Sequence, residues 1–332
     1  MTRFQKLATA ALVSVLALMF VGAIVRVTGA GMGCPDWPTC WGCLIPPTSV
    51  EQVNFDKLPL EKFQAKAKRM GRDPETITRE SLRAEFNPRH VWTEFINRMF
   101  SLPVGFFSLA TFIAAFWQRE KRPLVFWLAF TSLVVVLVNA WMGARVVYSG
   151  LSPAVLTTHL ALAMSLIGTL TYCAWRGTDQ VWRIRMDPAP LAKMRLLVTV
   201  LLLVIVAEGI MGSQVREMTD ELAKFHLNSP RSSWIPELER SWMYLVHRSF
   251  SWAVLGFSIW AWQMTKAHRT GGAGKVEKMV LGIVTAQMLL GLIMARIHIY
   301  NWVQVVHVGL AALLLTVVWL WRFGLSQEKR EV

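Results

Sequence analysis

Charged residues are scarce in this chain of 332 residues: they make up only 17% of it, whereas hydrophobic residues make up 54%. An average soluble domain is about 25% charged. The sequence therefore excludes an ordinary soluble protein. Acidic residues are scarcer than basic ones, with 21 Asp and Glu against 35 Lys and Arg. The position of that excess positive charge is informative about topology.

The hydrophobic residues occur in eight long runs. A helix needs about 20 apolar residues to cross a bilayer core of about 30 Å, and in lipid such segments must be helical because each backbone N–H and C=O needs an internal partner. We predict an all-α integral membrane protein with eight transmembrane helices. The runs cover residues 7–28, 92–117, 124–146, 153–175, 194–214, 241–265, 276–296 and 301–322. The first run is not a signal peptide, because it is long and continues through Arg26 into a glycine-rich motif.

The net charge of +14 would suit a nucleic-acid partner, but its distribution argues for membrane topology instead. Basic residues gather after the second, fourth and sixth runs and at both chain ends, whereas the short loop 148–152 is uncharged. They are Arg119, Lys121, Arg122, Arg176, Arg183, Arg185, Lys266, Arg269, Lys275, Arg3, Lys6, Lys329 and Arg330. Because short basic loops stay in the cytoplasm, we expect a plasma-membrane protein with both termini cytoplasmic and the long segment 29–90 outside.

Only four cysteines are present, and three of them fall in the outside segment, where a disulfide persists. Cys34–Cys40 is the pairing we favour. Cys40 and Cys43 have the spacing of half a zinc site, but a second pair is missing and the signal is weak. Cys173 is expected to be a packing residue.

The two halves of the chain resemble each other, at an offset of about 190 residues in the first helix and about 150 in the other three. The matched pairs are 22–26 with 212–216, 97–98 with 247–248, 143–145 with 291–296, and 159 with 307. Internal repeats of this kind are common in membrane proteins. We therefore expect an N-terminal four-helix half, residues 1–180, and a C-terminal four-helix half, residues 181–332.

The halves differ most in their first outside loops. Segment 29–90 is long and has an amphipathic, lysine-rich middle at 61–68, whereas segment 215–240 is shorter and polar. Either loop is suited to form a lid over an outward-facing site.

Two histidines lie at one depth in the second half. His247 and His307 each fall about six or seven residues into an inward-running helix, which is about 9–10 Å below the outer surface. In the first half His159 and Asn97 match them. A porphyrin between helices needs one axial ligand from each side, so the pattern favours heme. The alternative is that each histidine is a hydrogen-bonding residue of the bundle core.

Arginines accompany these positions. Arg26, Arg145, Arg216 and Arg296 lie at the outer ends of the odd-numbered helices, and Arg98 and Arg248 follow the ligand positions. Arginine binds carboxylates such as heme propionates well. Interfacial snorkelling is the alternative.

Glu94 has no acidic counterpart in the second half, where Tyr244 occupies the matching position. It is three residues before Asn97, hence on the same helix face, and is placed to take a proton or stabilise charge at a ring edge. The alternative is an ion pair with Arg98 or a loop lysine. Glu208 is a second acid within a membrane run, and the sequence suggests no role for it.

The remaining histidines are weaker candidates. His90 precedes Asn97 by seven residues and is a distant possibility as a replacement ligand. The others, expected to be solvated at loops or helix ends, are His226, His268 and His298.

These motifs resemble the heme A synthase family, whose members convert heme O to heme A for cytochrome oxidases, and the resemblance covers nearly the whole chain. It is carried by the segment 26–40, by Glu94-Phe-Ile-Asn97-Arg98, and by His159, His247-Arg248 and His307. The resemblance implies two pseudo-symmetric four-helix bundles.

The same resemblance implies a role for each matched residue. It implies a heme b on His247 and His307, a heme O substrate at His159 and position 97, and a functional glutamate at Glu94. It also implies a paired Cys34 and Cys40.

One residue departs from the family pattern. The second helix of the family usually reads Glu-x-x-His-Arg, whereas this chain has Asn97 in place of the histidine. Asparagine is a poor iron ligand, so a six-coordinate substrate heme is in doubt here.

The resemblance implies oxidation of a ring methyl to a formyl group by two successive hydroxylations. Partners would be lipid, heme O synthase, an electron acceptor and a second copy of the chain, with no nucleic acid. The alternatives are a diheme electron carrier, a heme transporter or chaperone, and an ion-coupled transporter. A carrier would be expected to keep both ligand pairs, and a transporter to place its polar residues near the bilayer midplane.

Overall fold

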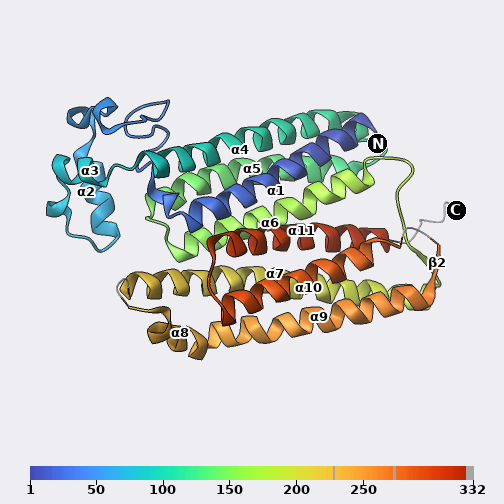
Figure 1. The fold of residues 1–332 in the computed structure, drawn as a ribbon. Helices are drawn as coiled ribbons and strands as arrows, with labels where there is room; N and C mark the ends of the chain where they lie inside the picture. Colours follow the sequence, from blue (N-terminus) through green and yellow to red (C-terminus); the bar gives the residue numbers. More distant parts are fainter. Residues whose placement is uncertain (227–228, 272–273, 327–332) are drawn as a thin grey trace.

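The computed structural model of the chain describes residues 1–226, 229–271 and 274–326, and almost all of them are helical or in short connections (Figure 1). The basic residues Lys329 and Arg330 and residues 227–228 of the second outside loop lie outside this part. The long helices are α1 (Arg3–Val27), α4 (Pro88–Ala115), α5 (Pro123–Tyr148), α6 (Pro153–Arg176), α7 (Pro188–Phe225), α9 (Trp242–His268), α10 (Val276–Arg296) and α11 (Asn301–Gly324).

Shorter elements lie between them. The short α-helices are α2 (Leu60–Arg69), α3 (Arg79–Glu85) and α8 (Arg231–Arg240). Single 3-10 turns occur at Ala30–Met32, Val50–Gln52, Phe55–Lys57, Pro74–Thr76 and Phe116–Gln118. Two short strands, β1 (Arg185–Met186) and β2 (Arg269–Gly271), pair antiparallel and tie the loop after α6 to the loop after α9.

Local sequence explains where the long helices begin and end. Four of them start with proline in the first turn, at Pro88, Pro123, Pro153 and Pro188. Proline has no backbone N–H, but an N–H in the first turn would have no partner within the helix, so proline costs no hydrogen bond there. Several end with an arginine in the last turn, where a positive charge complements the helix dipole.

Seven helices of the described chain are long and apolar enough to cross a membrane: α1, α4 with its 3-10 extension, α5, α6, α7, α10 and α11. They correspond to seven of the eight predicted runs. The eighth run is also a helix, α9, with 27 residues, but it does not reach the same hydropathy. Tryptophans and the His247-Arg248 pair lower its mean hydropathy, and its status as a span stays a prediction.

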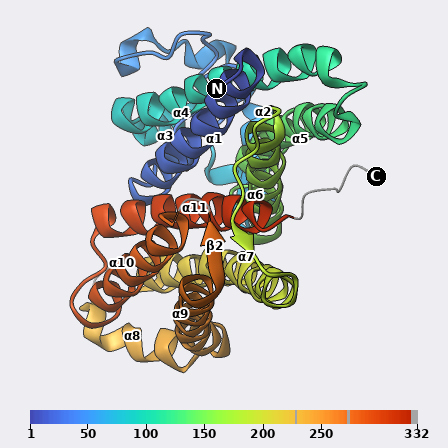
Figure 2. The same ribbon diagram turned by 90° about the vertical axis from the view of Figure 1, so that its right-hand side faces the viewer.

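The helices pack in two neighbouring sets. α1 lies against α4 and α6, and α5 lies against α4 and α6; likewise α7 lies against α9 and α11, and α10 lies against α9 and α11. The sets meet through α1 with α11, α6 with α11, and α6 with α7. The end-on view separates them clearly (Figure 2). Their main apolar core includes Leu201, Val280 and Trp321, all fully buried.

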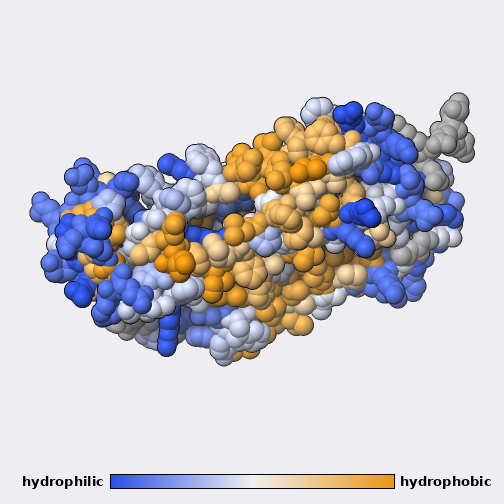
Figure 3. All heavy atoms as spheres, turned by 90° about the horizontal axis from the view of Figure 1, so that it is seen from above, coloured by the Kyte–Doolittle hydropathy of each residue, from blue (hydrophilic) through white to orange (hydrophobic). Residues whose placement is uncertain are grey.

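The outer surface carries a hydrophobic band. Figure 3 shows hydrophobic residues over the middle of the molecule and hydrophilic residues at both ends. Large apolar side chains such as Leu102, Phe106, Leu137 and Leu196 are more than half exposed. A soluble monomer rarely exposes so much contiguous apolar surface, and together with the apolar helices this makes the chain a multi-pass membrane protein.

The segment between α1 and α4, residues 28–87, folds into a compact unit that we call the cap. It projects from one end of the helices, which we call the cap end (Figure 1). The predicted amphipathic stretch is α2, which buries Phe63, Lys66 and Ala67. Trp41 packs against Phe63 and two other rings in a separate apolar cluster.

The second outside loop differs from the prediction. Segment 215–240 was expected to be a polar loop, but α7 continues to Phe225 and α8 follows. Glu217, Glu221 and Lys224 are good helix formers, so the change to polar residues ends the membrane-spanning run without ending the helix.

Candidate functional site

The predicted ligands of the second half lie close together. His247 is on α9 (Trp242–His268) and His307 on α11 (Asn301–Gly324), each in the first two turns at the cap end. They are near enough for their charges to interact. The two helices are not neighbours in the ring of four, because α7 and α10 lie between them. Side chains from such opposite helices can meet across the interior of the bundle.

Glycine makes room beside His247. A Cβ atom at Gly212 of α7 would lie 3.1 Å from Cε1 of His247, so the ring packs close to this face of α7 only because position 212 carries no side chain. The repeat places Gly22 beside Asn97 and Gly143 beside His159, where a Cβ would lie 3.8 Å from Oδ1 and 3.6 Å from Cε1. Three of the repeated glycines therefore mark the helix faces on which the candidate ligands pack.

Several polar atoms at these positions are buried and lack hydrogen bonds of normal geometry. They include Nδ1 of His159 and of His307, which face the backbone at Asn139 and Gln287, and Oδ1 of Asn97. Buried polar atoms are normally paired. A group of orphaned atoms on the predicted ligands indicates a site that a polar or metal-bearing ligand would complete.

Glu208, for which the sequence suggested no role, contacts a candidate ligand directly. Its Oε2 is 2.6 Å from Nδ1 of His247, and only 12% of the Glu208 side chain is exposed. Its other oxygen, Oε1, is buried without a hydrogen bond. Sequence reasoning identified Glu208 as an acid in the membrane but could not pair it with a residue 39 positions away.

Glu94 and Arg98 hold the cap rather than pointing into an open space. Glu94 is 3% exposed; its Oε2 accepts the backbone N–H of Cys34 at 2.7 Å, and its Oε1 accepts Nη2 of Arg98 at 2.6 Å. Arg98 also donates to the backbone carbonyls of Cys34, Asp36 and Thr39. The ion pair considered as the alternative for Glu94 is therefore present.

A buried lysine adds to this cluster. Lys66 of α2 is 7% exposed and donates from Nζ to the carbonyl of Pro35 at 3.2 Å. Burial lowers the pKa of Lys66 to about 8, while the nearby charges of Glu94 and Asp36 act in the opposite direction. The loop containing the disulfide is thus held by hydrogen bonds from two helices, α4 and α2.

The predicted disulfide is present. Cys34 and Cys40 are bonded, with a Cα–Cα distance of 4.6 Å. Cys43 is a free thiol whose backbone pairs with that of Cys40, and Cys173 is free and buried as expected. Within the described residues, groups of three or more His, Cys, Asp or Glu that could hold a lone metal ion do not occur.

The predicted arginines divide into two kinds. Asp220 of α7 binds both Arg26 and Arg216, at 3.4 and 2.8 Å, and Arg216 also donates to the buried Gln304. Arg98 is bound in the cap as described above, and the remaining three are exposed: Arg145 lies 5.5 Å from the Tyr148 ring centroid, and Arg248 and Arg296 have no side-chain partner among the described residues.

Asp220 and Gln304 were missed by the sequence analysis. Asp220 follows Arg216 by four residues, a spacing that favours an ion pair on a helix, and this signal could have found it. Among the weaker histidines, His90 and His226 are half-buried, and His268 and His298 are exposed.

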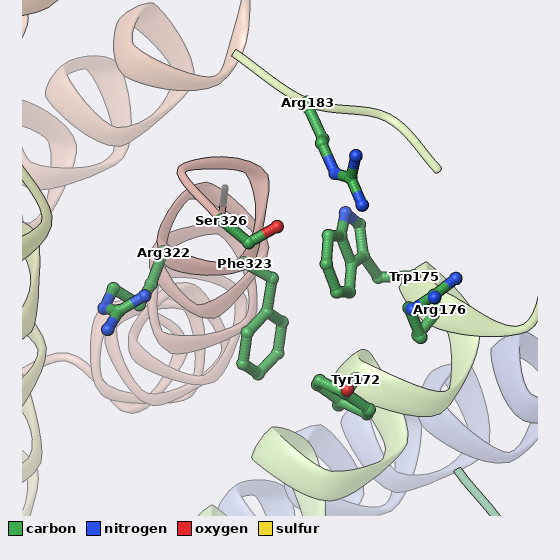
Figure 4. Close-up of a pocket in the computed structure, with 7 residues that line it drawn as sticks. All are labelled: Tyr172, Trp175, Arg176, Arg183, Arg322, Phe323 and Ser326. Atoms are coloured by element: carbon green, nitrogen blue, oxygen red, sulfur yellow. The ribbon is translucent and has the colours of Figure 1, made fainter. Parts of the chain in front are cut away.

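The cavity drawn in Figure 4 is at the other end of the molecule. It measures about 310 Å³ and is lined by residues from the C-terminal ends of α6 and α11, among them Trp175, Arg176, Arg322 and Phe323. All the predicted ligand positions are at the cap end, so this cavity is not the candidate site.

Known proteins are similar to this chain over most of its length. The family model described as "Cytochrome oxidase assembly protein" (COX15-CtaA) matches residues 5–319. A protein named heme A synthase from Shewanella oneidensis is 24% identical, over 92% of this chain and 91% of its own length. Proteins of that name from Rhizorhabdus wittichii and Methylobacterium nodulans are 25% and 27% identical, over 96% and 91% of this chain and 92% and 86% of their own lengths.

Proposed function

This chain belongs to the COX15-CtaA family of cytochrome oxidase assembly proteins, and we propose that it is a heme A synthase. The observation that carries the proposal is the match along nearly the whole chain to several proteins of that name. The function is that of an oxidoreductase that converts heme O to heme A. The expectation from the sequence motifs and the comparison agree.

For the fold we propose eight spans in two four-helix halves, residues 1–180 and 181–332, with α9 as the eighth span. The packing of α1, α4, α5 and α6 on one side and of α7, α9, α10 and α11 on the other supports this division. An even number of spans places both termini on one side, and the basic loops support the cytoplasm of a plasma-membrane protein.

In the C-terminal half we propose that His247 and His307 hold a heme b. Their positions on opposite helices and the orphaned Nδ1 of His307 fit such a group, and Gly212 leaves room for the His247 ring against α7. Arg216, Arg248 and Arg296 are the candidate propionate partners. A heme held by two histidines supplies a one-electron carrier.

In the N-terminal half we propose that His159 and Asn97 flank the substrate heme O, with Arg26, Arg98 and Arg145 as propionate partners. Asn97 is a weak ligand, and its buried, unpaired Oδ1 is suited to a hydrogen bond with a water on the iron. A site with a single strong ligand suits a heme that must enter as substrate and leave as product.

The proposed reaction oxidises one ring methyl in two steps. Each hydroxylation adds one oxygen atom from water and releases two protons and two electrons, and the resulting diol loses water to give the formyl group. Glu94, on the same face of α4 as Asn97, is the proposed proton acceptor or charge stabiliser. An electron acceptor must take the four electrons, and heme O synthase is the partner expected to supply the substrate.

Expression in a host that accumulates heme O tests the function. Membranes with and without the chain are extracted and their hemes separated by chromatography. Heme A, or its hydroxylated intermediate, is expected only where the chain is present. Heme O that stays unmodified, with the chain correctly inserted, would contradict the synthase proposal and favour a heme carrier or chaperone.

A further inference from the structure

A carboxylate inside a membrane span calls for an explanation, and Glu208 of α7 (Pro188–Phe225) is such a group. An acidic side chain within a bilayer core is costly, by a few kcal/mol, and is a functional candidate by default. Apolar residues surround it in sequence, from Leu201 to Ala207. Its short contact with His247, at 2.6 Å between Oε2 and Nδ1, is the one interaction of its carboxylate in the described chain.

The contact determines which nitrogen of His247 is available. An imidazole offers Nδ1 and Nε2, and a hydrogen bond to one of them leaves the other for a metal. Because the Glu208 carboxylate lies at ion-pair distance from Nδ1, Nε2 is the nitrogen left to bind iron. Carboxylate partners of this kind fix the orientation of a ligating histidine and raise its basicity.

α7 constrains the same ring in a second way. Gly212 is one turn after Glu208, on the same helix face, and a Cβ atom at this position would lie 3.1 Å from Cε1 of the His247 imidazole. The carboxylate therefore contacts one edge of the ring, and the absence of a side chain at Gly212 leaves room for the ring one turn further along the helix. The carboxylate and the close face of α7 at Gly212 together limit where the His247 ring can lie.

We propose that Glu208 is a positioning residue that orients His247 as an axial ligand and lowers the redox potential of the heme in the C-terminal half. The inference rests on the proposed function, which places a heme there. A more basic axial ligand stabilises ferric iron over ferrous iron, and hydrogen bonds to such ligands are among the means by which proteins tune potentials.

The repeat indicates that this device belongs to one half only. The position matching Glu208 at the offset of 190 is Leu18, and the ligand position matching His247 is Asn97. His307 and His159 face backbone groups rather than carboxylates. The ligand with a carboxylate partner is thus confined to the half proposed to hold its heme permanently.

Glu208→Gln tests the proposal, because glutamine keeps the size of the side chain and removes its charge. The matched control is Glu277→Gln. Glu277 is also a buried acid of the C-terminal half, but it lies in the first turn of α10, at the end away from the cap, and pairs with Arg269 at 2.6 Å. Both variants are purified with their heme. The midpoint potential of the bis-histidine heme is then titrated, and its low-spin electron paramagnetic resonance spectrum is recorded.

We expect Glu208→Gln to weaken the ferric preference about tenfold, which for a one-electron couple raises the potential by about 59 mV. Its resonance spectrum should shift as well, while Glu277→Gln matches the wild type. Loss of heme from Glu208→Gln alone also supports the orienting role. A Glu208→Gln protein with full heme content and wild-type potential and spectrum overturns the inference and leaves the synthase proposal standing. A wild type without a bis-histidine heme overturns the inference together with the proposed heme b site.

Discussion

Gly212 gives the sharpest prediction at the scale of single residues. In Gly212→Ala the new Cβ would lie 3.1 Å from Cε1 of His247, which forces the ring or the helix to shift by a few tenths of an ångström. We expect heme retention in the C-terminal half to fall about tenfold, equivalent to about 1.4 kcal/mol, measured as heme content after purification.

The matched control for this substitution is Gly291→Ala, the repeat counterpart of Gly143. A Cβ at Gly291 has no neighbour within 4 Å, so the heme content should equal that of the wild type. Equal losses in both variants would show that glycine matters for helix packing in general and not for the position of His247.

The residue scale also shows what the sequence could not supply. His247, His307, the repeated glycines and the Cys34–Cys40 bond were predicted from spacing or from motifs. The partners Glu208 and Asp220 were not, because a contact between residues on different helices depends on how the helices rotate about their axes. Hydropathy fixes the length of a span but says little about its rotation.

Glu94 has two separable roles, one in the cap and one in the reaction. Breaking a buried ion pair costs about 3–5 kcal/mol, so Glu94→Ala is expected to loosen the Cys34–Cys40 loop as well as to stop product formation. Glu94→Gln can still accept the N–H of Cys34, and we expect it to keep the cap closed, measured by resistance of the disulfide to reductant.

Heme A formation in Glu94→Gln distinguishes the roles. A loss of at least tenfold with the cap closed supports a chemical role for the carboxylate. Product formed at the normal rate by a folded Glu94→Gln or Glu94→Ala protein would show that Glu94 serves only to hold the cap.

At the scale of elements, the position of α2 depends on burying Lys66. Its pKa is lowered from 10.5 to about 8 in the folded cap, so between these values the unfolded cap binds more protons than the folded one. The free energy of unfolding the cap therefore rises with pH from about 8 to 10.5, by up to about 3 kcal/mol, and the full penalty for burying the charge is present below pH 8.

Hydrogen exchange of the cap backbone at pH 7 and pH 9 measures this dependence, after correction for the intrinsic exchange rate. Lys66→Met keeps a similar volume without a titrating group, and its cap should show no such rise. A wild-type cap whose protection is equal at the two pH values would contradict the placement of Lys66.

The sequence predicted the helices better than it predicted the contacts between them. Seven predicted runs are helices that can cross a membrane, and the amphipathic stretch 61–68 is α2. The extension of α7 to Phe225 was missed because hydropathy detects the membrane boundary and not the end of a helix. The folded cap was foreseen only as a loop, since its core forms around Trp41 and a disulfide.

For the whole molecule, the number of spans determines on which side of the membrane each terminus lies. With α9 as a span there are eight, and both termini share one side; with seven, they lie on opposite sides. We expect reporters that act only in the cytoplasm to be active when fused to either terminus, and a cysteine introduced in loop 148–152 to react with an impermeant label from outside. An external C-terminus would contradict the eight-span topology.

The central claim is a division of labour, in which one half holds a heme and the other oxidises one. Chromatography of the hemes extracted from purified His159→Ala and His307→Ala proteins, expressed where heme O is made, tests it most directly. The account predicts that His159→Ala keeps heme b and yields no heme A, whereas His307→Ala loses most of its heme b. The same heme composition in both variants would contradict it, because the two histidines would then not serve separate sites.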